Sequence, residues 1–189
     1  MRMGLKKLIC IVLFIPLLAC SGKAAKEESP ESLFELGLNY LRGNDSLGIY
    51  MNKEKGIALI RRSAEQGDAA AQSNLGNAYY TGEGVPQDYT QAVSWYRKAA
   101  EQGYAEAQLR LGACYASGEG VIQDLVQAVY WARKSADQGN SYGQCFLAGC
   151  YFWGQGVPQD YIQAIYWWRK AAKQGNPMAI KILSNIENN

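Results

Sequence analysis

The sequence contains no histidine. Histidine is the general base of serine and cysteine catalytic triads and a frequent zinc ligand, so its absence excludes both types of site. The sequence also has no Ser-x-x-Lys motif, which carries the nucleophile of class A β-lactamases and penicillin-binding proteins. Its acidic pair Glu27-Glu28 lies in a short polar segment and not in a region that we expect to fold. We therefore expect neither catalysis nor a metal ion or cofactor.

The chain also lacks an excess of either charge. It has 19 Lys and Arg residues against 17 Asp and Glu, and three of the cations lie near the N-terminus at Arg2, Lys6 and Lys7. Binding of nucleic acid needs a basic patch or stripe, so nucleic acid is not an expected partner. Hydrophobic residues make up 48% of the 189 residues, which is enough to bury a core.

No apolar run is long enough to cross a bilayer. A spanning helix needs about 20 apolar residues, whereas the run over residues 8–19 has about a dozen. It follows a short basic segment, and this combination is typical of a signal peptide. The run ends in Leu17-Leu18-Ala19-Cys20, which resembles the bacterial lipobox.

The lipobox resemblance implies a lipid-anchored protein. It predicts a signal peptide over residues 1–19 and acyl chains on Cys20, and two chains are enough for stable membrane anchoring. The absence of Asp at Ser21 favours the outer membrane of the cell envelope by the same resemblance. Residues 20–30 are polar and predict a flexible tether. The alternative is an ordinary signal peptide followed by a chance cysteine.

The rest of the chain repeats itself with a period of 36 residues. Three units, 69–104, 105–140 and 141–176, align without a gap, and a weaker unit over 31–68 precedes them. The first unit is three residues longer, and we place the extra length in the loop between Gly43 and Gly56. Such self-similarity is typical of a solenoid of stacked repeats.

Each unit predicts two helices joined by a glycine-rich loop. In the second unit, Leu75 and Tyr79 lie at helical spacing, and Gly82 follows as a stop signal. Asp88 then predicts an N-cap, with Gln91 placed as in a capping box. Gly103 and its counterparts stand where a second helix would end. Residues 177–189 repeat only the first half of a unit, and we expect them to form a capping helix.

The repeated pattern A-x-x-x-L-G-x-x-Y-x-x-G-x-G-V-x-x-D-x-x-x-A-x-x-W-x-x-K-A-A-x-Q-G resembles the Sel-1-like repeat family, a relative of the tetratricopeptide repeats. The resemblance covers roughly residues 33–188. It implies an all-α solenoid of about four helix-turn-helix repeats. Members of this family mainly bind other proteins, often as adaptors, and in bacteria many are secreted or envelope proteins. Departures such as Leu59 in place of Trp and Ile122 in place of Pro weaken single contacts rather than the fold.

The cysteines do not predict a disulfide. Cys114 and Cys150 hold the same place in successive repeats, about 10 Å apart, which is too far for a bridge. Cys145 and Cys150 lie five residues apart on one predicted helix and point away from each other. The absence of an expected disulfide distinguishes the chain from the cysteine-rich branch of the family. In that branch, paired cysteines form a disulfide in each repeat, and some members have been linked with penicillin binding.

Two further periodic features have an ordinary structural explanation. Trp95, Trp131 and Trp167 recur every 36 residues, which favours packing between repeats over a ligand box. The Arg-Lys pairs that follow them, such as Arg97-Lys98, lie toward the ends of second helices. There cations suit the helix dipole and the solvent, although a basic ladder is the alternative.

First helices line the concave surface of tetratricopeptide-like stacks, so we searched them for a binding site. Mapping by the Leu-Gly landmark places Tyr80 of the second repeat on that surface. In the fourth repeat it places Cys145, Gly149, Phe152 and Trp153 there, with Tyr142 nearby. Exposed aromatic side chains are enriched at interaction hot spots, so Tyr80, Tyr142, Phe152 and Trp153 are our candidate protein-binding residues. The alternative is that the C-terminal helix or the tether covers them.

These features predict a non-enzymatic scaffold or adaptor, anchored by lipid in the cell envelope, that binds a peptide or helix of an envelope or host protein on its concave face. We expect no small-molecule substrate. The alternative is an envelope enzyme, or a regulator of one, that acts on peptidoglycan or β-lactams. The sequence motifs give little support to the alternative that the protein is an enzyme.

Overall fold

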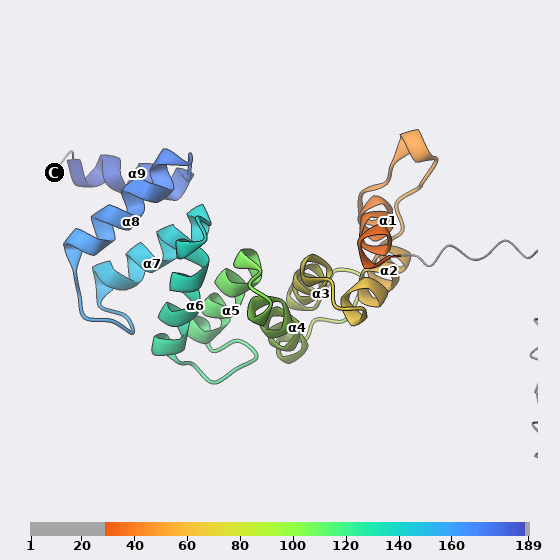
Figure 1. Ribbon diagram of the computed structural model, residues 1–189, viewed down its shortest axis with the longest axis horizontal. Coiled ribbons are helices and arrows are strands. Elements are labelled where there is room, and N and C mark those ends of the chain that lie inside the picture. Colours follow the sequence, from red (N-terminus) through yellow and green to blue (C-terminus); the bar gives the residue numbers. More distant parts are fainter. Residues whose placement is uncertain (1–28, 188–189) are drawn as a thin grey trace, which may run out of the picture.

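The computed structural model describes residues 29–187, and these residues are almost entirely helical (Figure 1). The helices are α1 (Pro30–Arg42), α2 (Lys53–Glu65), α3 (Ala69–Thr81), α4 (Tyr89–Glu101), α5 (Ala105–Ser117), α6 (Leu125–Asp137), α7 (Ser141–Trp153), α8 (Tyr161–Lys173) and α9 (Pro177–Glu187), with a short 3-10 helix η1 (Asp45–Leu47). The predicted all-α solenoid of four helix pairs and a terminal helix is confirmed. The predicted signal peptide, Cys20 and most of the tether lie outside the described residues.

The helix pairs follow one another along a curved array (Figure 1). Each helix packs against its neighbours in sequence, and α5 also contacts α7. The first helices α3, α5 and α7 lie toward the inside of the curve, and the second helices α4, α6 and α8 lie toward the outside. None of the helices formed by residues 29–187 is both long and apolar enough to cross a membrane.

The predicted stop and start signals bound the helices. Gly82 ends α3 with a φ of 77°, in the left-handed region that glycine adopts at low cost. The Asp88 side chain accepts a hydrogen bond of 3.0 Å from the Gln91 backbone N–H and caps α4. The reciprocal half of the predicted capping box is not formed, because the backbone N–H of Asp88 donates instead to the carbonyl of Tyr79 at 2.9 Å.

Small residues let the two helices of a repeat approach closely. A Cβ atom on Gly76 of α3 would lie 2.6 Å from the Tyr96 ring of α4, so this position has no room for a side chain. The ring itself is buried, and its hydroxyl donates to the Asn77 side-chain oxygen at 2.7 Å. Leu75, on the same helix, is fully buried.

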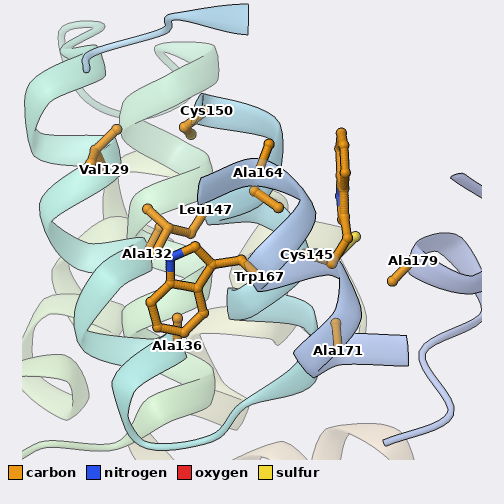
Figure 2. Packing of buried hydrophobic residues seen from close by; sticks show 12 residues of the cluster. Val129, Ala132, Ala136, Cys145, Leu147, Cys150, Ala164, Trp167, Ala171 and Ala179 are labelled. Atoms are coloured by element: carbon orange, nitrogen blue, oxygen red, sulfur yellow. The ribbon is translucent and has the colours of Figure 1, made fainter. Parts of the chain in front are cut away.

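The repeated tryptophans contribute to the contacts between repeats. Trp167 of α8 shares one buried cluster with Ala132 and Ala136 of α6 and with Leu147 of α7 (Figure 2). Trp95 is also buried, whereas Trp131 remains half-buried. The structure therefore places these residues in packing roles, as the sequence analysis favoured.

A ladder of buried amides joins the repeats at one edge. The Gln72 side chain donates to the backbone carbonyl of Ala64 in the preceding repeat at 3.0 Å, and accepts a bond of 2.7 Å from Gln102 of its own repeat. The same pair of bonds recurs with Gln108 and Gln144 at the centre. Because a buried polar group without a partner costs about 1–3 kcal/mol, this ladder fixes the register of successive repeats.

The extra residues of the first repeat form a distinct loop. η1 lies in it, and Asn44 and Ile49 face each other in a short antiparallel bridge. This is the segment in which the sequence analysis placed the additional length. The loop projects from the array beside α1 (Figure 1).

Candidate functional site

Two adjoining hollows of about 260 and 270 Å³ lie on the inner side of the array. Their floors and walls come mostly from the first helices α5, α7 and α9, and they share three lining residues, Cys145, Phe146 and Met178. We call the two hollows together the inner groove. Its lining residues also include Leu109, Arg110, Ala113, Tyr142, Gly149, Cys150, Trp153, Gln155, Trp168, Asn176 and Ile182.

Trp153 and Tyr142 lie at opposite ends of the inner groove and are accessible. The Trp153 side chain is 69% exposed, although it is a large apolar residue. Between them, Gly149 leaves the helix backbone bare, and a Cβ atom there would meet nothing within 4 Å. The groove therefore has an apolar floor with room for a side chain of another molecule. Such a site fits an apolar anchor rather than a polar ligand.

The structure adds residues to the groove that the sequence analysis did not select, and three of them had a signal in the sequence. These are Phe146 of α7 and Met178 and Ile182 of α9. Their signal was present in the sequence, because Phe146 lies four residues after Tyr142 and Ile182 lies four residues after Met178, so each pair shares one helix face. α9 thus forms one wall of the groove and leaves Trp153 exposed, in contrast to the alternative in which the C-terminal helix covers it.

Phe152 lies mostly beneath this surface. Its ring packs against Trp153, Tyr161 and Trp168, with ring centroids 4.8, 5.3 and 5.3 Å away. The side chain is half-buried and belongs to the fourth-repeat core. Phe152 therefore supports Trp153 from below and is not itself an open contact residue.

Tyr80 is separate from the inner groove and is held by its own protein. Its hydroxyl donates to the Glu119 carboxylate at 2.8 Å, and its ring packs edge-on against Tyr89 at 5.1 Å. The hydrogen bond to Glu119 is the main reason that the pKa of Tyr80 is raised to about 12, so the phenol is neutral at physiological pH. This geometry joins the second repeat to the third.

The three cysteines of the described residues are free, as predicted, and all are buried. Cys145, which the sequence analysis expected to line the concave surface, lies at the bottom of the inner groove and is almost covered. Burial raises the pKa of its thiol, and it raises the pKa of Cys114 and of Cys150 to about 11. These thiols are protonated at neutral pH and are poor nucleophiles.

The Arg-Lys pairs on the second helices are not simply solvated. The Lys98 ammonium lies 3.9 Å from the centre of the Trp95 ring, in a cation–π contact. Arg97 donates to the Tyr115 hydroxyl of the next repeat at 2.9 Å, and Arg133 makes the equivalent bond to Tyr151. The arginines therefore link successive repeats, which the helix-dipole argument did not anticipate.

The chemistry of the inner groove suits binding. Within residues 29–187, no group of three or more Asp, Glu, Cys or His side chains is placed to hold a metal ion. The groove's two thiols, Cys145 and Cys150, are protonated, and its one charged lining residue, Arg110, is paired with Glu106 at 2.9 Å. What the groove offers is apolar surface, an exposed indole and a bare stretch of helix.

The chain matches the family model described as Sel1 repeat at residues 30–68, 69–104, 105–140 and 141–176. A Sel1 repeat protein from Oxalobacter formigenes is similar in structure, with a TM-score of 0.79, 37% identity and coverage of 86% of this chain and 63% of that one. A protective antigen of uropathogenic Escherichia coli with an SLR fold has a TM-score of 0.75 and 40% identity, over 82% of this chain and 33% of that one.

Cysteine rich protein B of Helicobacter pylori shares the fold alone, at 19% identity and a TM-score of 0.58, with coverage of 69% of this chain and 97% of that one. No curated protein matches the chain. The chain thus spans less than two thirds of the length of the first two structures.

Proposed function

This chain belongs to the Sel1 repeat family, and from that premise we propose that it is a non-enzymatic adaptor that binds an apolar segment of a partner protein in the inner groove. The observation that carries the proposal is the exposed Trp153 beside the bare backbone of Gly149. An exposed indole next to an unfilled apolar floor is the arrangement of an interface hot spot. Tyr142 forms the far end of the contact.

The amino-acid side chains of the groove favour a helical segment as the partner. Asn77, on the inner face of the second repeat, is already bound by the Tyr96 hydroxyl. At the equivalent positions, the third and fourth repeats carry Ala113 and Gly149. An extended peptide needs partners for its backbone N–H and C=O groups, whereas a helix satisfies its own. An amphipathic helix therefore suits this surface better.

The test is photo-crosslinking in intact cells from a photoreactive residue at position 153. We expect one discrete crosslinked protein, identified by mass spectrometry, and no such product from a probe at Glu101, an exposed residue at the end of α4. Introducing Gly149→Leu should abolish the product, because the added side chain fills the groove floor. Crosslinks only to α9 of the same chain would contradict the proposal.

Gly149→Ala is the matched control for that substitution. Its single methyl group enters open space at a helical position, so the groove stays open. Alanine is also the better helix former, and the variant should be more stable by roughly 0.5–1 kcal/mol. Crosslinking that survives Gly149→Ala but not Gly149→Leu separates blocking of the site from damage to the fold.

We also propose that the protein is a lipoprotein of the cell envelope, anchored through Cys20 and sorted to the outer membrane. The support is the Leu17-Leu18-Ala19-Cys20 motif after a basic and apolar leader. Replacing Cys20 with Ser should abolish incorporation of radiolabelled palmitate and release the protein from the membrane fraction. Palmitate labelling that is unchanged in Cys20→Ser would show that this cysteine is not the lipid attachment site.

A further inference from the structure

The outer side of the array changes in character from the second repeat to the fourth. Three equivalent positions, four residues apart, face outward on each second helix and the loop before it. The second repeat has Pro86, Thr90 and Ser94; the third has Ile122, Val126 and Tyr130; the fourth has Pro158, Ile162 and Tyr166. We call Ile122, Val126, Tyr130, Ile162 and Tyr166 the outer ridge. All five side chains are exposed, with Ile122 at 89% and Ile162 at 81%.

The repeat fold does not require these apolar side chains. α4 is formed with Thr90 and Ser94 at the same positions, and its buried face is made by residues such as Ala92 and Tyr96. Val126 and Tyr130 therefore do not replace core contacts but add apolar surface to the outside of a complete helix. Exposed apolar side chains along one helix face, such as Val126 and Tyr130 in the third repeat, are typical of an interaction site.

The charges next to the outer ridge are mostly positive. Lys134 lies 5.2 Å from the Tyr130 ring centre, and Lys170 lies 4.9 Å from that of Tyr166. α8 contains Arg169, Lys170 and Lys173 and no acidic residue. Lys173 stands where α4 has Glu101 and α6 has Asp137, so positive charge increases toward the fourth repeat.

Two of the acidic residues near the ridge, Asp124 and Asp160, have structural roles. Asp124 accepts hydrogen bonds from the backbone of Val126 and Gln127, and Asp160 accepts one from Gln163. Each carboxylate is thereby held at the N-terminus of its helix, where the helix dipole offsets its charge. Among the other charged residues of α6 and α8, the five cations Arg133, Lys134, Arg169, Lys170 and Lys173 outnumber the single acidic residue Asp137.

A hollow of about 900 Å³ adjoins the α8 part of the ridge. Ile162, Ile165 and Leu183 give it an apolar floor, and Arg169 and Lys173 stand at its edge. Apolar surface bordered by cations is complementary to a molecule with an apolar body and an anionic head.

We propose that the outer ridge docks on the surface of an anionic lipid bilayer. The aliphatic side chains of Ile122, Val126 and Ile162 would enter the headgroup region, and the two tyrosine rings would lie at its boundary with water. Tyrosine with a neighbouring lysine is typical of that boundary, because the ring is amphipathic and the ammonium reaches the headgroups. This docking does not depend on lipid modification of Cys20 or on the inner groove.

A bilayer fits the ridge better than a protein does. The ridge side chains are exposed, and apart from the tyrosine hydroxyls they carry no hydrogen-bonding groups. A protein partner would need such groups, or a matching pocket, to fix its orientation. A fluid lipid surface needs only apolar insertion and opposite charge.

Full-length protein with a single environment-sensitive fluorophore tests the proposal. The fluorophore is attached to Ile162→Cys in one protein and to Thr90→Cys in another, because the two positions are equivalent on α8 and α4. The protein without an added cysteine gives the labelling background. With phosphatidylglycerol vesicles we expect a blue shift and quenching by brominated lipid at position 162. The probe at position 90 should remain in water, even when the protein is anchored to the same vesicle.

Two kinds of variant, one that removes a charge and one that removes apolar side chains, identify the cause of the shift. Lys134→Gln and Lys170→Gln should each lower the docking equilibrium constant about fivefold, since a cation near an anionic surface contributes about 1 kcal/mol. Val126→Thr with Tyr130→Ser copies the second-repeat residues into the third, so it should weaken docking without disturbing the fold. Helix content by circular dichroism checks that the variants are folded.

The proposal fails if the probes at positions 162 and 90 respond alike, or if phosphatidylcholine and phosphatidylglycerol vesicles give the same signal. It also fails if position 162 responds only after envelope proteins are added to the vesicles, since the ridge would then be a protein interface.

Discussion

Gly120→Ala is expected to lower the free energy of unfolding by about 3–5 kcal/mol. Gly120 has a φ of 72°, and a Cβ atom there would overlap the backbone carbonyl of Tyr89 in the preceding repeat. The left-handed conformation alone costs alanine roughly 1–2 kcal/mol. The steric overlap adds to this, because the atoms in the way are backbone atoms at the start of α4 and not a flexible side chain. Urea denaturation followed by circular dichroism measures the loss.

Two other glycines separate these contributions. Gly118 has a similar φ of 79°, but a Cβ atom there would lie 3.3 Å from the Cβ atom of Gln123, a tight contact that calls for a shift of only a few tenths of an ångström. Gly103 has a φ of 92° with nothing nearby. Gly103→Ala should therefore show the conformational cost alone, and Gly118→Ala only slightly more. If all three variants lose the same stability, the overlap with Tyr89 has no energetic consequence.

Leu111→Ala is the second substitution with a large expected effect. Leu111 is fully buried in the cluster that joins α4 to α5, together with Ala107 and Tyr96. Removing its side chain takes away apolar burial and leaves a cavity, which typically costs about 2–5 kcal/mol. Because the array is a chain of repeats that contact only their neighbours, the denaturation midpoint should fall and the transition should lose cooperativity.

Leu109→Ala provides the comparison on the same helix. Leu109 is half-buried at the wall of the inner groove, so its loss creates no closed cavity. We expect it to cost less than half as much stability as Leu111→Ala while changing the crosslinking pattern from position 153. Equal destabilisation by the two substitutions would mean that Leu109 is part of the core rather than of the groove.

The fold could be predicted well from the sequence because the signals that start and stop its helices are local. Gly82 stops a helix and Asp88 starts the next through contacts within a few residues, and these signals recur in every unit. The half-repeat at the C-terminus was recognised in the same way, and Asn176 caps α9 through the Ala179 N–H at 3.0 Å.

The candidate site was harder to predict because it depends on contacts between repeats. Alignment correctly placed Trp153 on an open surface, but it could not distinguish its neighbour Phe152, which turns into the fourth-repeat core. Tyr80 aligns with Ala116 and Phe152, and its hydroxyl is held by Glu119, which lies 39 residues away. The amide ladder through Gln72 was missed for the same reason, since a single unit gives no sign that the residue is buried.

The amide ladder has a consequence for how such chains change in length. The second and third units each carry both the glutamine that donates to the unit before it and the backbone carbonyl that accepts from the unit after it, as Gln72 and Ala100 do in the second unit. The donor and the acceptor of each bond lie eight residues apart, so inserting a residue between them would disturb the bond, whereas adding 36 residues would supply a new pair. Duplication of whole units therefore leaves every existing hydrogen bond of the ladder intact. The number of units can change in this way while the structure of each unit stays the same.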